Sequence, residues 1–346
     1  MTRRSWPKRL WAALDARLAL HNFLYEVPAY ANTFPYLLGA LALMGLLLLV
    51  GTGVLLGQFY VPDPGAANAS VRALMTAVPA GPVLRGIHAW AADLTLVVVI
   101  LHMLRVFVTG SYRFPRDANW TVGVALLATV LAFYFTGTVM RWDQESIEAL
   151  EHNVEVARLL GAAGGWFSPA FAAHVPLLTR LSMAHVSLLP LALFILVTAH
   201  VYLVRQHGIS PLPFPAAPGP RRTFGQHLLK AAGYGVILLG VSVLLATLLP
   251  PGEGPAPVAG VEVTKPPWPF LPAYGLENWF GLPGLLWGTV ALFALLLSVP
   301  LLDRTPDGEW SARRRVLVLG MCALGVLVGF GVYAWVSHPL PHLHLH

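Results

Sequence analysis

The chain has 346 residues, of which 56% are hydrophobic and 11% are charged, and its mean hydropathy is +0.66. A soluble domain carries about a quarter charged residues, so this composition excludes a soluble globular protein and predicts a polytopic membrane protein. The formal net charge is +6. Its basic residues cluster at alternate ends of apolar segments, which is typical of membrane topology and argues against nucleic-acid binding. The single cysteine, Cys322, excludes a disulfide framework, a thiolate metal site and a CxxCH haem-attachment sequence.

Seven apolar segments are long enough to cross a bilayer. They cover residues 34–57, 84–108, 120–140, 177–205, 226–249, 281–302 and 315–337. Their apolar runs are continuous instead of alternating, and a backbone in lipid must satisfy its own hydrogen bonds, so we expect helices. The predicted fold is all-α, with about seven transmembrane helices.

Three sequence units follow from these spans. Residues 1–33 are basic and amphipathic, lack the pattern of a signal peptide, and are expected to lie on the cytoplasmic membrane surface. Residues 34–215 form a four-helix unit, and residues 216–346 form a three-helix unit with a Pro-rich outer loop at about 250–280. If the N-terminus is cytoplasmic, that side collects sixteen of the 22 Lys and Arg residues. The positive-inside rule therefore predicts this orientation, in the cell (inner) membrane.

Two of the spans each carry two histidines. His88 and His102 are 14 positions apart in the second span, which places both on nearly the same helix face and about 21 Å apart along the axis. His185 and His200 are 15 positions apart in the fourth span, about 60° off register but still on one broad face. Polar side chains in a membrane usually face the bundle interior and serve a function.

These four residues predict two haem sites. Two imidazoles that face each other across a bundle can ligate one iron axially, so two pairs at two depths would hold two non-covalent b-type haems. A single membrane histidine is as often an interhelical hydrogen-bonding residue, but four in this arrangement favour the haem interpretation. Arginines beside the histidines suit haem propionates, because guanidinium offers a planar fork to carboxylates. They are Arg85, Arg105 and Arg180.

Glycines repeat the same vertical spacing. Gly39 and Gly53 are 14 apart in the first span, and Gly123 and Gly137 are 14 apart in the third. Glycine lets a flat macrocycle approach the backbone closely. The alternative is ordinary small-residue packing between helices, which we would favour for an isolated pair. Two pairs in register with two histidine pairs favour haem contact.

Several stretches resemble one family. The segment RGIHAWAADLTLVVVILHMLRVFVTGSYRFPRDANWTVGV, the tripeptide WDQ at 142–144, LTR before His185 and RQHGIS after His200 resemble cytochrome b/b6, the membrane core of bc1 and b6f complexes. The similarity is closest to the b6 type, and residues 216–346 resemble the family's subunit IV, here fused. The resemblance covers nearly the whole chain and is looser after residue 216.

The resemblance implies a function. The chain would be the dihaem subunit of a quinol–cytochrome c (or plastocyanin-type) oxidoreductase, with His88 and His185 at an outer haem and His102 and His200 at an inner haem. Quinol would be oxidised at the outer face and quinone reduced near the cytoplasmic face, coupled to proton translocation. A Rieske iron–sulfur protein and a c-type cytochrome would be partners, and the complex would be a homodimer.

The resemblance also assigns quinone regions. Trp142 and Asp143 of the WDQ tripeptide, and Trp268 in the loop before the sixth span, would belong to the outer quinol region. His207 would lie near the inner quinone site. The family's Pro-Glu-Trp-Tyr sequence carries a glutamate that accepts a quinol proton, but here Pro267 stands in its place. Either a nearby carboxylate, Glu262 or Glu277, substitutes for it, or quinol chemistry at this site differs or is lost.

Other departures leave alternatives open. Arg141 replaces the proline that precedes the family's WDQ-like sequence, and Asp143 could pair with it. The cysteine through which the b6 type attaches a further haem is replaced near Leu37, so no covalent haem is expected. A transmembrane electron conduit without quinol bifurcation remains possible, as does, from another class, a non-redox haem-binding scaffold. The C-terminal sequence HPLPHLHLH could bind a metal, although a solvated tail is the more frequent case.

Overall fold

The computed structural model describes residues 10, 14, 15, 17, 26–210, 222–258, 260–303 and 310–342. Within these residues, seven helical spans are long and apolar enough to cross a membrane, which confirms the all-α prediction. They are α2 (Phe34–Leu56), α4 (Gly81–Thr109), α5 (Asp117–Met140), α7 with α8 (Leu177–Met183 and Leu189–His207), α9 (Phe224–Leu248), α10 (Leu271–Leu302) and α11 (Trp310–Val336). The expectation for residues 1–25 lies almost wholly outside the described residues.

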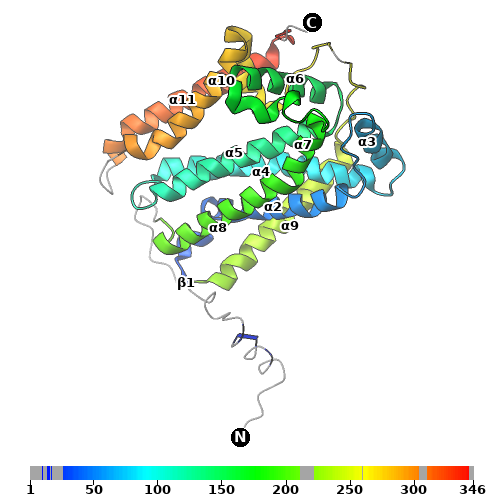
Figure 1. The fold of residues 1–346 in the computed structure, drawn as a ribbon. Helices are drawn as coiled ribbons and strands as arrows, with labels where there is room; N and C mark the ends of the chain where they lie inside the picture. Colours follow the sequence, from blue (N-terminus) through cyan, green and yellow to red (C-terminus); the bar gives the residue numbers. More distant parts are fainter. Residues whose placement is uncertain are drawn as a thin grey trace.

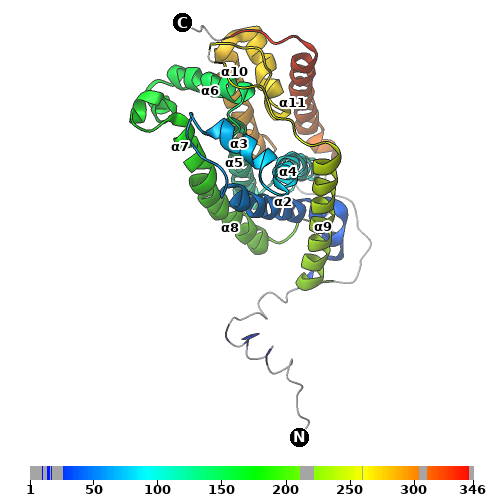
Figure 2. The ribbon, with the colours of Figure 1, turned by 90° about the vertical axis from the view of Figure 1, so that its right-hand side faces the viewer.

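Helices α4 and α5 run through the middle of the molecule (Figure 1). Helix α2 packs against α4, and α8 packs against α5, so these four helices build the bundle that carries the histidines. Helix α9 packs on α4 and α2, as Figure 2 shows from the side, while α10 and α11 pack on each other and reach α5. Helix α9, the first helix of the predicted three-helix unit, therefore packs directly on the bundle that carries the histidines.

Two short strands connect the start of the bundle to α9. Strand β1 (Glu26–Val27) pairs antiparallel with β2 (Arg222–Thr223), which directly precedes α9. Thr223 then caps α9 in a capping box with Gln226, in which each side chain bonds to the other residue's backbone N–H. The entry of α9 into the bundle is thus fixed by local hydrogen bonds as well as by packing.

The side predicted to be outer contains two helices beyond the seven predicted spans. They are α3 (Ala67–Thr76) and α6 (Gln144–Leu159). Helix α10 begins ten residues before the predicted span, after a 3-10 helix at Trp268–Phe270, and it bends at Gly281, where φ is 67°. The polar residues of its first turns resemble a loop in sequence, yet Leu271 and Tyr274 are buried in a cluster with Ala334 of α11.

The span that carries His185 and His200 is not a continuous α-helix. Residues Ala184–Leu188, between α7 and α8, form a π turn. Pro190 follows and has no N–H to donate to the carbonyl of residue 186, which removes one α-helical hydrogen bond and favours the wider turn. A π turn holds one residue more than an α turn. The 15-residue spacing therefore corresponds to the 14-residue spacing of α4, and the 60° offset expected from an ideal helix does not apply.

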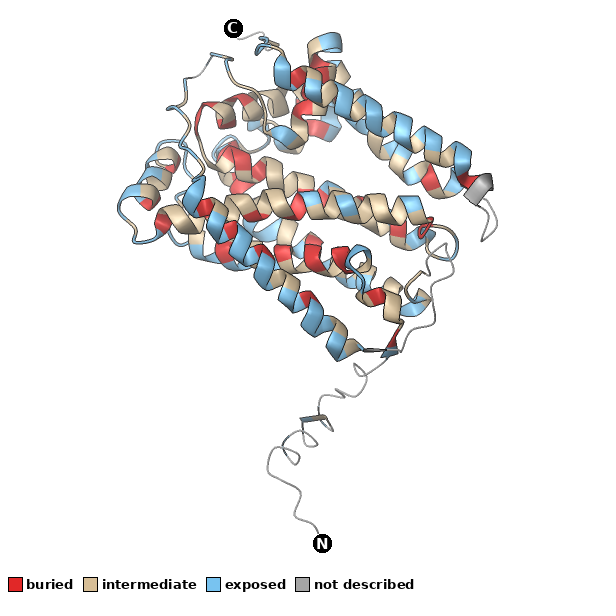
Figure 3. Ribbon diagram, turned by 180° about the vertical axis from the view of Figure 1, so that it is seen from behind, coloured by how far each residue is buried: buried red, intermediate tan, exposed pale blue. Residues whose placement is uncertain are grey.

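The outward faces of the outer helices are exposed (Figure 3), and many of the exposed side chains are apolar. Exposed side chains on them include Phe194, Leu229, Val236, Trp287 and Trp335. In water such a surface would be unstable, whereas lipid tails are as apolar as these side chains. The exposed apolar bands are therefore the lipid-facing surface of a multi-pass membrane protein.

A buried charged group holds the end of α4 to α10 and α11. The guanidinium of Arg313 donates to Oδ2 of Asp303 at 3.1 Å and to the carbonyl oxygens of Phe107 and Val108 at 2.9 and 2.8 Å. The hydroxyl of Tyr112 donates to the same Asp303 oxygen at 2.5 Å. Both charged side chains are at most 3% exposed. The pair satisfies the last carbonyls of α4, which have no helical partner of their own.

We expect Arg313→Ala to lower the free energy of unfolding by about 3–5 kcal/mol, because it removes the guanidinium that pairs with the buried Asp303 carboxylate and donates to two carbonyls at the end of α4. The measurement is thermal unfolding of the purified protein in detergent. Arg314→Ala, one position along on an exposed part of α11, is the matched control and should change stability little. Equal effects of the two substitutions would contradict the role given to the buried pair.

Candidate functional site

The two outer histidines share one arrangement. Nδ1 of His88 lies 2.8 Å from Oγ1 of Thr52 on α2, and Nδ1 of His185 lies 2.8 Å from Oγ1 of Thr136 on α5. Each threonine hydroxyl is also within hydrogen-bond distance of a carbonyl of its own helix, at 2.9 Å to Leu48 and 2.7 Å to Ala132.

These contacts favour one imidazole tautomer. A hydroxyl has one proton to donate, and the helix carbonyl can only accept it. When the hydroxyl donates to that carbonyl, its oxygen accepts from the histidine, and Nδ1 of His88 and of His185 carries the proton. Nε2 of each ring is left as an unprotonated lone pair, which is the form that ligates a metal. Sequence reasoning missed Thr52 and Thr136, although each directly precedes a predicted glycine, Gly53 and Gly137.

The inner histidines face each other directly. The ring centroids of His102 and His200 are 6.3 Å apart, and their planes are inclined by 76°. Two imidazoles on opposite sides of one iron, with bonds of about 2 Å, place their centroids roughly 6 Å apart. Nδ1 of each ring is buried without a hydrogen-bond partner in the described residues. The spacing of the two rings fits axial ligation of one iron.

Each of the four predicted glycines lies beside one of the four histidines. A Cβ atom added to Gly39 would lie 3.0 Å from Cε1 of His102, and one added to Gly53 would lie 3.4 Å from Cε1 of His88. A Cβ atom added to Gly137 would lie 3.2 Å from Cε1 of His185, and one added to Gly123 would lie 3.8 Å from Cε1 of His200. The missing side chains therefore make room for the imidazole edges, and each ring is held against a neighbouring backbone.

The three predicted arginines have different surroundings. Arg105 stacks over the ring of Tyr36 at 3.7 Å, and its Nε and Nη2 are buried without a partner in the described chain. Arg180 donates to the carbonyls of Trp166 and Ser168, which leaves Nε unpaired. Arg85 instead donates to the carbonyls of Pro251 and Gly252. Arg105 and Arg180 thus keep donors free for an anionic group, whereas Arg85 holds the loop after α9.

The WDQ tripeptide is where α5 ends and α6 begins. Trp142 adopts a positive φ of 53°, an uncommon conformation for a bulky residue, and its carbonyl accepts from Asn68 of α3. Asp143 is buried and caps α6 by accepting from the backbone and hydroxyl of Ser146. It also lies 3.6 Å from Arg141, so the expected ion pair is present.

Helix α6 holds the loop that follows α9. The side chain of Gln144 donates to the carbonyl of Val261 and accepts from the N–H of Val258. The carboxylate of Glu148 accepts from the backbone N–H groups of Val263 and Thr264, each at 2.9 Å. The loop expected to be long and irregular is therefore fixed to α6 by its backbone.

Trp268 contacts a carboxylate that sequence reasoning did not consider. Its indole Nε1–H donates to Oδ1 of Asp93 at 2.7 Å, and the hydroxyl of Tyr134 donates to the same oxygen at 2.6 Å. Asp93 lies on α4, five residues after His88, and is half-buried. An ionisable residue inside a predicted span was the signal that could have identified it. The proline at position 267 is next to this contact and supplies no acceptor side chain.

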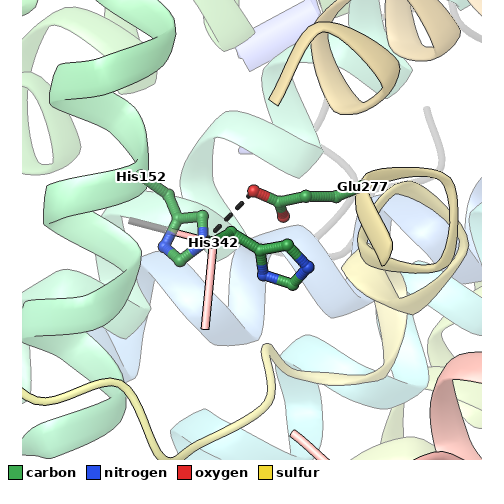
Figure 4. Close-up of side chains that lie close together, drawn as sticks. All are labelled: His152, Glu277 and His342. Atoms are coloured by element: carbon green, nitrogen blue, oxygen red, sulfur yellow. Dashed lines mark ion pairs between the residues drawn. The ribbon is translucent and has the colours of Figure 1, made fainter. Parts of the chain in front are cut away.

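The two carboxylates proposed from sequence meet at one histidine. Nε2 of His152 on α6 lies 3.3 Å from Oε1 of both Glu262 and Glu277. His342 joins them from the C-terminal segment, with Nδ1 3.2 Å from Oε1 of Glu262. Figure 4 shows His152, Glu277 and His342 converging from three separate segments. Burial lowers the pKa of His152, but the ion pairs with Glu262 and Glu277 outweigh it and raise the pKa to about 10.

His207, the predicted inner residue, is at the last position of α8. Its carbonyl accepts from Nη2 of Arg116 at 2.9 Å, which ties the end of α8 to the start of α5. The structure thus places it at the end of the bundle nearest the inner histidines, on the same helix as His200.

The histidine pairs, their glycines and the free arginine donors fit a haem at each of two levels. The family profile described as "Cytochrome b/b6/petB" matches residues 25–208, which contain all four histidines. The chain belongs to the cytochrome b/b6 family. Its members bind b-type haem, and this membership agrees with the multi-pass fold.

Relatives extend the likeness beyond that region. This cytochrome b chain is 36% identical over 197 residues to a menaquinol:cytochrome c reductase cytochrome b subunit of Bacillus subtilis, covering 54% of this chain and 88% of that protein. It is 33% identical over 304 residues to a cytochrome bc complex cytochrome b subunit of Chlorobaculum thiosulfatiphilum, covering 82% of this chain and 70% of the other. The second match is too long to lie within residues 25–208.

A solved structure shares the whole fold. A chain of a hyperthermophilic respiratory Complex III superposes with a TM-score of 0.79 at 25% identity, covering 95% of this chain and 92% of that chain. The arrangement of α9 to α11 is therefore shared with that chain. The resemblance found in the sequence is confirmed at the level of family and fold.

If His88 and His185 ligate a haem, we expect Thr52→Val and Thr136→Val to raise its midpoint potential by about 20–60 mV each, because a lost hydrogen bond of about 0.5–1.5 kcal/mol makes the imidazole a weaker donor to oxidised iron. A redox titration of the purified protein measures it. Thr129→Val is the matched control, since Thr129 is a buried residue of α5 that bonds only to the carbonyl of Ala125. A shift of the inner potential instead would contradict the assignment.

Proposed function

We propose that this chain is the dihaem cytochrome b subunit of a quinol–cytochrome c oxidoreductase of the bc type. It would carry electrons across the membrane between an outer quinol site and an inner quinone site, coupled to proton translocation. One observation carries the proposal. An imidazole pair with a glycine beside each ring occurs twice, at two levels of the bundle. The reductase and complex named among the relatives support the choice of reaction.

The residues that would hold each haem follow from the site. His88 and His185 would ligate the outer iron and His102 and His200 the inner iron. Arg180 and Arg105 would pair with propionates on the outer and inner sides, and Arg85 would do so only if its loop contacts rearrange. When bound, the two haems supply one-electron transfer across the bilayer. No covalent attachment is proposed, because the single cysteine lies in α11, away from the bundle start.

The protein's own part at the outer site is to hold and deprotonate quinol. We assign this region to Trp142, Asp143 and Trp268, with Asp93 as the proton acceptor. An ionised Asp93 could take a proton from a quinol hydroxyl while Tyr134 and Trp268 keep the carboxylate oriented. Glu262 and Glu277 remain the other candidates, although each already pairs with His152. His207 would serve the inner site, where reduced quinone takes up protons.

The partners and the orientation rest on chemistry and charge. Two-electron oxidation of quinol, with one electron sent through the haems, needs a second one-electron acceptor outside this chain. A Rieske-type iron–sulfur protein that passes electrons to a c-type cytochrome meets that need, and the complex would be a dimer. The excess of basic residues on the predicted N-terminal side supports a cytoplasmic N-terminus in the cell membrane.

Pro267 favours a second candidate function. If no carboxylate serves the outer site, the chain would be a transmembrane electron conduit in a variant complex and would not divide quinol electrons. The two functions share the haem sites and differ only at Asp93, Trp268 and the loop before α10. The two functions are therefore distinguished by substitution of Asp93, whereas substitution of His88 tests the haem sites that both functions share.

His88→Ala should remove one of two b-type haems and leave the inner haem spectrally intact, because only the outer iron loses a ligand. The measurement is pyridine hemochrome content per chain together with a redox titration. His174→Ala, in the segment before α7, is the control and should retain both haems. Loss of both haems in the His88 variant, or of neither, would count against the pairing, and a chain that purifies without haem would contradict the function.

Asp93→Asn should lower quinol–cytochrome c reductase turnover of the purified complex by about 10–100-fold at unchanged haem content, because the amide cannot accept the proton. Tyr134→Phe keeps the carboxylate and should have a much smaller effect. Full activity of Asp93→Asn combined with inactive Glu277→Gln would transfer the role to Glu277. A wild-type complex with reducible haems and no quinol oxidation would support the conduit.

A further inference from the structure

A second group of ligand-type side chains lies outside the haem bundle. His152 belongs to α6, Glu262 to the loop after α9, Glu277 to the first turns of α10, and His342 to the segment after α11. One ligand atom from each of His152, Glu277 and His342 lies within 4.8 Å of the other two. Figure 4 shows these three side chains together, and Glu262 joins them through its contacts with His152 and His342.

Glu277 is the clearest sign that this group is incomplete. Its side chain is 0% exposed, and neither carboxylate oxygen forms a hydrogen bond within the described chain. Nε2 of His152 and Nε2 of His342 are likewise buried without a hydrogen-bond partner there. A buried carboxylate without hydrogen bonds is costly, and the ion pair with His152 alone leaves its second oxygen unsatisfied.

The distances in the group suit a cation better than hydrogen bonds. The three contacts between a ring nitrogen and a carboxylate oxygen are 3.3, 3.3 and 3.2 Å, longer than the roughly 2.7–2.9 Å of a charge-assisted hydrogen bond. Four ligands placed tetrahedrally at about 2.0–2.2 Å from an ion are separated from one another by roughly 3.3–3.6 Å. The contacts therefore have the length of the edges of a tetrahedral coordination shell.

We propose that His152, Glu277 and His342, with Glu262 as a fourth ligand, form a binding site for one divalent cation of the zinc class. Two imidazole nitrogens favour Zn²⁺ over Mg²⁺ or Ca²⁺, which prefer oxygen ligands. The ion takes the place of the proton that otherwise links His152 to the carboxylates. This site is separate from the four bundle histidines and does not depend on the proposed redox function.

The site would fasten three parts of this region to one another. Glu262 already accepts from the backbone N–H of His342 at 2.6 Å, and the ring of His342 packs on Tyr274 with centroids 5.3 Å apart. The C-terminal segment thus lies over the first turns of α10. A cation here joins that segment and the loop after α9 to α6, which also carries Gln144 and Glu148.

The test uses the purified complex, treated with chelator, dialysed and then titrated with Zn²⁺ alone. Elemental analysis should give one tightly bound Zn²⁺ per chain, and X-ray absorption should show nitrogen and oxygen ligands at about 2.0–2.2 Å with two imidazoles. His342→Ala removes a ligand without altering a helix and should weaken binding at least tenfold. His152→Gln should do the same, with haem spectra showing that each variant is folded.

Controls come from the other histidines of the C-terminal sequence. His338→Ala and the double variant His344→Ala/His346→Ala should retain the Zn²⁺ of the wild type. Loss of binding in that double variant, with retention in His342→Ala, would mean that the tail alone chelates the ion and would overturn the proposal. So would a wild-type complex that takes up no Zn²⁺, or equal binding by the wild type and His152→Gln. None of these readouts requires quinol oxidation.

Discussion

The hydrogen bond between a threonine hydroxyl and Nδ1 of a histidine is the interaction on which the outer half of the bundle depends. A polar ring in a bilayer must be satisfied, and the threonines satisfy one nitrogen while leaving the other as a lone pair. The same residues fix the ring orientation, because each hydroxyl is tied to its own helix backbone. The inner pair lacks this support in the described chain, so the two levels differ in electronic environment although they share the glycine arrangement.

The outer end of the molecule is built around α6. Gln144 and Glu148 bind the backbone of the loop after α9, and Asp143 caps the helix. Farther along α6, His152 contacts the carboxylates of Glu262 and Glu277. A loop rich in proline has few N–H groups for regular structure, so side chains of a neighbouring helix must accept those that remain. This explains why a chain that lacks the usual glutamate before Trp268 still presents an ordered surface there, with Asp93 reaching it from the opposite side.

Hydropathy was sufficient to predict the seven spans, and the histidine spacing was sufficient to predict that each pair shares one helix face. The family was predicted from the resemblance of sequence segments such as WDQ and RQHGIS. The start of α10 was not predictable, because Glu277 and Asn278 resemble loop residues until Leu271 and Tyr274 are seen to pack on α11. Thr52, Thr136 and Asp93 were missed for a different reason. Each role depends on a contact with a residue far along the chain, which no local pattern encodes. The separation is 36 positions for Thr52, 49 for Thr136 and at least 41 for Asp93. The haem-ligand assignment and the quinone residues remain predictions.

The π turn at Ala184–Leu188 means that residue counts do not measure depth in this fold. The span that holds His185 and His200 has one more residue between its histidines than α4 has, yet it faces the same two levels. The extra residue lies in the turn that contains His185, whereas His200 follows on regular α-helix. The ring of His185 can therefore be reoriented by changes within one wide turn without moving His200, so evolution or design can adjust the outer level while the inner level stays in place.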